Sequence, residues 1–208
     1  TAVVAMVINS MLHVANAGDA RAVLCRAVPD DGIAPAKGIR LSVDHKPGLV
    51  EERRRIEAGG GQVLRRRGVD RVEGFLAVSR ALGDLGLAPH VTCAPFTSST
   101  KLGPLDEYLI LACDGVWDVL SDDEAAAIVS TRARLSPEKG GGVDGASQAL
   151  VDISLRKGST DNITVQVIAL HKSPSEKQQQ EKAEAPIVVG SVADAMAMVE
   201  SMPAAASA

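Results

Sequence analysis

The sequence predicts an α+β protein in which helices and mostly antiparallel strands share one domain. Short apolar runs separated by turn residues open the chain, which is typical of an antiparallel meander. Two later segments are predicted as helices ended by glycines, and a β-branched alternating run closes the pattern. A chain of 208 residues, 46% of them hydrophobic and 23% charged, suits one globular core.

The first half of the chain predicts a meander, a helix and a hairpin. Asn9-Ser10 and Ala17-Gly18-Asp19-Ala20 are the turns of the meander. The following helix has a charged face and ends at three consecutive glycines. The predicted elements are strands at 2–8, 11–15 and 21–25, a helix at 49–58, and hairpin strands at 62–64 and 71–78 around the turn at 68–70.

The second half predicts an inner strand, two helices and a closing strand. The apolar run at 109–113 is typical of a strand buried on both faces. Ser121 and Glu124 have capping-box spacing, so a helix should follow from 125 to about 130. A second helix is predicted at 146–156, stopped by Gly158, and a closing strand at 162–170.

The chain is predicted to divide into one domain and a tail. Residues 1–171 carry all the strong strand and helix patterns. Residues 172–186 are polar and predict a disordered linker, because they could not repay their ordering entropy by burial. Residues 187–208 form an Ala-rich tail that could make a short helix.

Charge and composition argue against several kinds of partner. A net charge of −4 and 2% aromatic residues offer neither an electrostatic footprint nor a stacking surface for nucleic acid. No run approaches the roughly 18 apolar residues needed to span a bilayer, so no membrane association is expected. The three cysteines are widely spaced without a C-x-x-C pair, which favours a reducing intracellular compartment. We expect a monomer.

Four aspartates at strand ends are the strongest functional signal. Asp114 follows the buried run at 109–113, and Asp118 lies four positions later. Asp19 lies in the second meander turn, and Asp161 precedes the closing strand. Aspartate oxygens without His or Cys ligands suit Mg²⁺ or Mn²⁺. The alternative is that each turn aspartate caps backbone amides, as such residues commonly do.

Six sequence blocks together carry a family resemblance. They occur in the order seen in metal-dependent protein Ser/Thr phosphatases of the PP2C type (PPM family), which the chain resembles over nearly all of residues 1–171. The blocks are Asn16-Ala17-Gly18-Asp19-Ala20-Arg21-Ala22-Val23, Asp44-His45-Lys46-Pro47, residues 52–60, residues 71–84, residues 109–121, and Gly158-Ser159-Thr160-Asp161-Asn162-Ile163-Thr164-Val165.

The resemblance implies a fold, an activity and a role for each aspartate. It implies two packed antiparallel β-sheets flanked by helices, with a metal cluster at one end of the sandwich. It also implies hydrolysis of phosphoserine and phosphothreonine on phosphorylated protein substrates by a metal-activated water, in the cytoplasm or nucleus. Asp114 and Asp161 resemble ligands of a dinuclear Mg²⁺ or Mn²⁺ centre, and Asp19 and Asp118 resemble residues that help hold a weaker third ion.

The chain also departs from the family pattern. The opening portion of the family contains a phosphate-binding arginine and an Asp-Gly-His-Gly-type motif, which supplies a bridging ligand and a general-acid histidine. Neither Asp31-Gly32 nor Asp114-Gly115 is followed by histidine, so nothing later in the chain replaces that motif. We expect the general-acid histidine and the phosphate-binding arginine upstream of Thr1, which is the first residue of the sequence. The chain is therefore expected to be N-terminally incomplete and inactive by itself, with no catalytic residue assigned in it.

Two functions remain open at this point. In one, the full-length protein is an active phosphatase. In the other, it is a catalytically dead, phosphatase-like binding or scaffold module. Retention of all four aspartates favours the enzyme.

Overall fold

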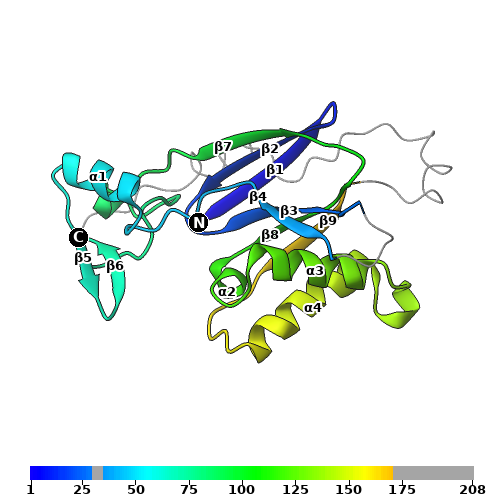
Figure 1. Cartoon of the computed structure of the whole chain (residues 1–208). Coiled ribbons are helices and arrows are strands. Elements are labelled where there is room, and N and C mark those ends of the chain that lie inside the picture. The colour runs from blue at the N-terminus through cyan, green and yellow to red at the C-terminus, as the bar shows by residue number, and fades with distance from the viewer. Residues whose placement is uncertain (30–34, 171–208) are drawn as a thin grey trace, which may run out of the picture.

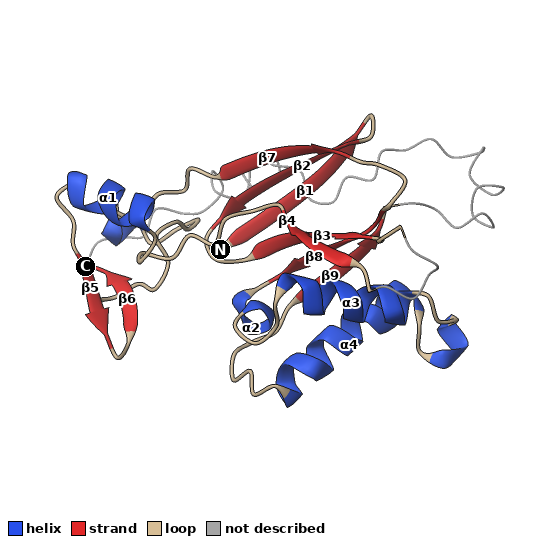
Figure 2. Ribbon diagram, viewed as in Figure 1, coloured by secondary structure: helices blue, strands red, loops and turns tan. Residues whose placement is uncertain are grey.

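The protein consists of two antiparallel β-sheets and a helical layer stacked in that order. The computed structural model describes residues 1–29 and 35–170. A three-stranded sheet packs on a four-stranded sheet, and the long helices cover the outer face of the latter (Figures 1 and 2). The predicted α+β class and the two packed antiparallel sheets are confirmed. Within the described ranges, helices cover one outer face of the sandwich rather than both. The predicted linker and tail lie outside these ranges.

Most strands belong to the two sheets, and a separate hairpin lies beside them. The three-stranded sheet has the order β1 (Ala2–Ile8), β2 (Met11–Ala17), β7 (Phe96–Lys101). The four-stranded sheet has the order β4 (Lys37–Arg40), β3 (Arg21–Arg26), β8 (Asp106–Ala112), β9 (Val165–Ala169). The hairpin consists of β5 (Val63–Arg66) and β6 (Val69–Val72).

Four α-helices and two short 3₁₀ turns complete the described chain. The α-helices are α1 (Val50–Ala58), α2 (Asp114–Trp117), α3 (Asp122–Ala133) and α4 (Gly142–Arg156). The 3₁₀ turns are Leu85–Leu87 and Pro137–Lys139. The predicted capping box forms at the start of α3, where the amide of Glu124 donates to the Ser121 hydroxyl and the Ser121 amide donates to the Glu124 carboxylate.

Strands β3 and β8 form the middle of the molecule. Because successive side chains of a strand point to opposite faces, Leu24 and Leu109 pack between the two sheets, whereas Val23 and Ile110 pack against the helices. All four side chains are 0–2% exposed. The prediction that 109–113 is an inner strand is therefore confirmed, since β8 lies between β3 and β9.

Several predicted boundaries were wrong for identifiable reasons. The hairpin turns at Arg67-Gly68, both with positive φ, as a two-residue turn of the primed type requires, and not at 68–70. Its second strand ends at Val72 because Glu73 and Gly74 also have positive φ. Strands β4 and β7 were not predicted, because β4 has only four residues and β7 consists mostly of Ser and Thr, which give a weak strand pattern.

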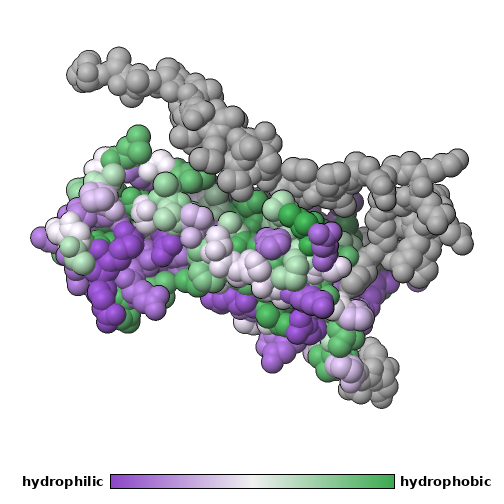
Figure 3. All heavy atoms as spheres, turned by 90° about the horizontal axis from the view of Figure 1, so that it is seen from above, coloured by the Kyte–Doolittle hydropathy of each residue, from purple (hydrophilic) through white to green (hydrophobic). Residues whose placement is uncertain are grey.

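Helix α1 and the β5–β6 hairpin form a small unit with its own apolar cluster around Ile56 and Val72. This unit extends from one end of the sandwich (Figure 1). Its surface is rich in exposed arginines, and Figure 3 shows hydrophilic side chains gathered at this end of the molecule. The exposed arginines are Arg54, Arg65, Arg66 and Arg67.

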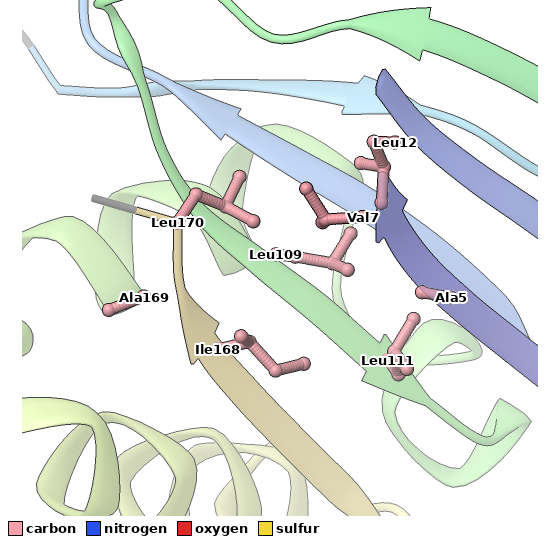
Figure 4. A pocket seen from close by; sticks show the side chains of 8 residues that line it. All are labelled: Ala5, Val7, Leu12, Leu109, Leu111, Ile168, Ala169 and Leu170. Carbon is pink, nitrogen blue, oxygen red and sulfur yellow. The ribbon is translucent and has the colours of Figure 1, made fainter. Parts of the chain in front are cut away.

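An apolar cleft of about 240 Å³ lies between the two sheets. Its lining comes from β1, β2, β8, β9 and the residue that follows β9 (Figure 4). Among the described residues, those that line it carry no ionisable side chain, so they offer it no metal ligand or proton-transfer group. Within the described ranges, no helix has the length and apolar character needed to cross a bilayer.

Candidate metal centre

The register of the four-stranded sheet brings Asp19 close to Asp114. Antiparallel pairing sets Arg21, the first residue of β3, opposite Ala112, the last residue of β8. Asp19 lies two positions before β3 and Asp114 two positions after β8, so both carboxylates extend from the same end of the sheet. The backbone pairing therefore assembles two acidic groups that are 95 positions apart in the sequence.

The two carboxylates repel each other in a poorly hydrated position. Asp19 is 8% exposed, and Asp114 is partly buried at the N-terminus of α2. Burial, followed by the negative charge of Asp114, raises the pKa of Asp19 from 3.8 to about 6, although Lys46 opposes the shift. A pair of close carboxylates that resist ionising together has the electrostatic character of a cation-binding site.

Lys46 supplies a positive charge to this acidic group. Its Nζ lies 3.3 Å from Oδ1 of Asp118 and 3.8 Å from Oδ2 of Asp19. Asp118 follows α2 one helical turn after Asp114, and its amide donates to the Asp114 carbonyl at 2.8 Å. Burial opposes the charge of Lys46, but the neighbouring carboxylates, led by Asp118, raise its pKa overall. Three of the four predicted ligands thus gather around one ammonium group.

Asp161 lies at the same end of the sheet, and its carboxylate has a local partner. The loop before β9 packs closely on α2, where a Cβ added to Gly115 would collide with the carbonyl oxygen of Asn162. Oδ1 of Asp161 accepts the amide of Asn162 at 2.7 Å, which is the capping role that the sequence left as the alternative. Across residues 1–29 and 35–170, no group of three or more His, Cys, Asp or Glu side chains is arranged to hold a metal ion.

Thr1 lies beside the turn that carries Asp19. The pairing of Ala2 with Ala17 brings the start of β1 to the end of β2, and a Cβ added to Gly18 would collide with the side chain of Thr1. The turn before Asp19 therefore depends on a glycine, which also has a positive φ of 118°. No residue of this chain tests the assignment of a general-acid histidine and a phosphate-binding arginine, which therefore stays a prediction.

A buried arginine fixes the elements that carry the acidic group. Arg21 is 7% exposed and its guanidinium binds Asp44 through two nitrogens, while Nη1 donates to Asp122 at 2.6 Å. Its Cζ lies 4.8 Å from the ring centroid of Trp117. The guanidinium therefore ties the start of β3 to α2, to the start of α3 and to the segment that carries Lys46.

His45 links that segment to the turn of Asp19. Its ring is 1% exposed, and Nδ1 lies 3.0 Å from the carbonyl oxygen and 3.3 Å from the amide nitrogen of Gly18. Either tautomer of the ring therefore forms a hydrogen bond with Gly18. Burial, then the charge of Arg80, lowers the pKa of His45, which keeps the ring neutral. The geometry gives His45 a structural role.

Glu52 of α1 joins the arginine-rich unit to the same segment. Its buried carboxylate accepts from the Ser79 hydroxyl at 2.7 Å and from Arg80 at 2.6 Å. Burial would raise the pKa of Glu52, but Arg80, Arg55 and Ser79 lower it to about 2. The amide of Ser79 donates to the carbonyl of His45 at 2.9 Å, so a continuous hydrogen-bonded path runs from α1 to the residue before Lys46.

The sequence reasoning assigned no role to Lys46, Arg21 or Glu52. Arg21 gave a usable signal, because a charged residue that opens an apolar strand must find a partner if it is buried. Neither Lys46 nor Glu52 gave a sequence signal of this kind. A single lysine beside a proline, or a glutamate in a charged helix, is most often a solvated surface residue.

Replacing Asp19 by Asn should stabilise the metal-free chain. Because its folded-state pKa is raised, the folded protein binds the proton more tightly than the unfolded chain. The free energy of unfolding should therefore fall as the pH rises from about 4 to 6. At pH 7.5, Asp19→Asn should recover about 1–3 kcal/mol, measured by urea unfolding. The exposed Asp84→Asn should change it by less than about 0.5 kcal/mol. A less stable Asp19→Asn variant at pH 7.5 would contradict this account.

The fold and the acidic group define a class of protein before any relative is considered. That class is a two-sheet sandwich covered by helices, with clustered aspartates where strands of its central sheet end. The family model for protein phosphatase 2C matches residues 1–163. The chain belongs to the protein phosphatase 2C family.

Individual relatives agree with this membership. The chain is 44% identical to protein phosphatase 2C 50 of Oryza sativa subsp. japonica, over 82% of this chain and 46% of that protein. It is also 44% identical to protein phosphatase 2C homolog 1 of Schizosaccharomyces pombe, over 80% of this chain and 42% of that protein. The chain thus spans less than half the length of these curated relatives.

Solved structures show the same fold. A serine-threonine phosphatase 2C from Toxoplasma gondii aligns with a TM-score of 0.67 and 28% identity, over 80% of this chain and 57% of that chain. A C. elegans sex determining protein aligns with a TM-score of 0.69 and 27% identity, over 78% of this chain and 37% of that chain.

Proposed function

We propose that the natural full-length protein carrying this chain is a metal-dependent phosphatase that hydrolyses phosphoserine and phosphothreonine on proteins. The observation that carries the proposal is the pairing of Asp19 with Asp114, with Asp118 nearby, at one end of a protein phosphatase 2C sandwich. A scaffold that had lost catalysis would have no need for a buried pair of like charges that costs stability.

The donor set fits a hard divalent cation. Asp114 and Asp161 would hold the dinuclear centre, while Asp19 and Asp118 would help to hold a third ion. All four offer carboxylate oxygens, which Mg²⁺ and Mn²⁺ prefer. When bound, the ions would supply an activated water and neutralise phosphate charge. A cation would also relieve the repulsion between Asp19 and Asp114 that the sheet register imposes.

The residues of this chain have a positioning task in that reaction. Arg21 holds β3 and α2 together. Asp19, which precedes β3, therefore keeps its spacing from Asp114 and Asp118 at the two ends of α2. His45 fixes the Gly18 backbone beside Asp19. The carboxylates that would hold the metal ions are thereby set in place before a substrate arrives, and such preorganised electrostatics is usually the largest contribution to catalysis.

The test is turnover of p-nitrophenyl phosphate and of a phosphothreonine peptide by the natural full-length polypeptide. We expect Mn²⁺-dependent hydrolysis that a chelator abolishes, and no measurable turnover from the 208-residue chain alone. Hydrolysis that persists after chelation would overturn the proposal. A folded full-length protein with no turnover under any divalent cation would favour the scaffold function.

A further inference from the structure

We propose that Lys46 is a tethered cation that shares the carboxylates of Asp19 and Asp118 with bound metal and so weakens metal binding at this part of the cluster. The inference deepens the proposed function and rests on it. It concerns regulation of the site by a residue for which the sequence offered no role.

The position of the ammonium group carries the argument. Nζ of Lys46 forms a hydrogen bond with Asp118 at 3.3 Å and lies 3.8 Å from Asp19. It also interacts electrostatically with Asp114. These carboxylate oxygens are the donors that a divalent cation would use, and one oxygen lone pair cannot serve both cations at full strength. Any ion that binds Asp19 and Asp118 must therefore displace this ammonium group or accept its repulsion.

The backbone around Lys46 is fixed by hydrogen bonds, so the competition between its ammonium group and a metal ion follows from the fold itself. The amide of His45 donates to the Gly18 carbonyl at 2.9 Å, and the amide of Ser79 donates to the His45 carbonyl at 2.9 Å. Pro47 follows and is buried. The start of the side chain is thus fixed beside Asp19, so little conformational entropy is lost when the ammonium group approaches the carboxylates.

The far end of the side chain remains able to move. Lys46 is 43% exposed in its side chain, and Asp118 is 64% exposed. A flexible four-carbon stem lets the ammonium group withdraw into solvent while its backbone stays in place. Lys46 then acts in two ways: it neutralises the carboxylates when metal is absent, and it sets how much metal is needed to replace it.

Mn²⁺ titration of the purified 208-residue chain, followed by the EPR signal of free Mn²⁺, tests this directly. We expect Lys46→Met to tighten the Kd for Mn²⁺ by about five- to tenfold. Lys46→Arg keeps the charge and should stay within about twofold of the wild type. The matched control is Lys101→Met, since exposed Lys101 pairs with Met11 at the end of β2 that is far from Asp19.

Thermal unfolding without metal supplies an independent measurement. Lys46→Met should lower the Tm by about 2–4 °C, because the carboxylates lose their counter-ion, and Mn²⁺ should raise its Tm more than that of the wild type. Near-UV circular dichroism confirms that each variant is folded.

The outcomes separate this inference from the proposed function. If Mn²⁺ binds the wild type and Lys46→Met with the same Kd, the tethered-cation role is wrong while the phosphatase proposal stands. If neither binds Mn²⁺ at millimolar concentration, the inference fails for this chain, and full-length turnover decides the proposed function separately.

Discussion

Asp114→Asn in the natural full-length protein is expected to lower turnover of p-nitrophenyl phosphate by at least about a hundredfold. Asn keeps the shape of the side chain but removes its charge and one carboxylate oxygen. Metal ions in such centres contribute several kcal/mol of transition-state stabilisation, and each 1.36 kcal/mol corresponds to a factor of ten in rate. Loss of a central ligand should therefore reduce kcat rather than only raise KM.

The position of Asp114 makes this substitution informative. It is the first residue of α2, two positions after β8, and the pairing of β8 with both β3 and β9 fixes this backbone, so the variant should fold. Asp161→Asn should reduce turnover comparably. The exposed Asp123→Asn, also in the first turn of a helix, is the matched control and should keep turnover within about twofold. Undiminished turnover in both Asp114→Asn and Asp161→Asn would refute the metal-ligand assignment.

Arg21→Met should lower the free energy of unfolding of the 208-residue chain by about 2–3 kcal/mol. Methionine retains an apolar stem against Trp117 but removes the guanidinium. Asp122 then keeps its hydrogen bonds to Arg40, whereas the carboxylate of Asp44 keeps, among the described residues, only Arg40 Nη1 at 3.8 Å. The side chains of Asp44 and Asp122 are 14% and 19% exposed. Breaking a buried ion pair from one side costs stability, because the carboxylate of Asp44 is left weakly paired in a poorly hydrated place.

A second variant separates charge pairing from packing. Arg21→Met/Asp44→Asn removes the charge that Arg21→Met leaves weakly paired, so it should be more stable than Arg21→Met alone. The exposed Arg54→Met, on the solvent side of α1, is the control and should change stability by less than about 0.5 kcal/mol. Urea unfolding monitored by Trp117 fluorescence and far-UV circular dichroism measures all three. A loss below about 1 kcal/mol in Arg21→Met would contradict the role given to this network.

Local patterns were sufficient for many elements. The apolar run before Asp114 predicted a central strand, and the spacing of Ser121 and Glu124 predicted the start of α3, because both signals depend on residues close together in the sequence. Strand β7 was not predicted because its Ser and Thr side chains give little hydrophobic pattern. Pairing with β2 decides its structure.

The sequence by itself determined the family and the two-sheet class, and it predicted four aspartates as candidate metal ligands. Only the tertiary structure decided which of them meet. The register of β3 against β8 brings Asp19 to Asp114, and long-range packing carries Lys46 to Asp19 and Asp118. Such contacts join residues up to 95 positions apart, and they arise from strand pairing and buried polar networks rather than from any local pattern of residue types. Lys46, for which the sequence offered no role, therefore lies among the aspartates of the candidate site.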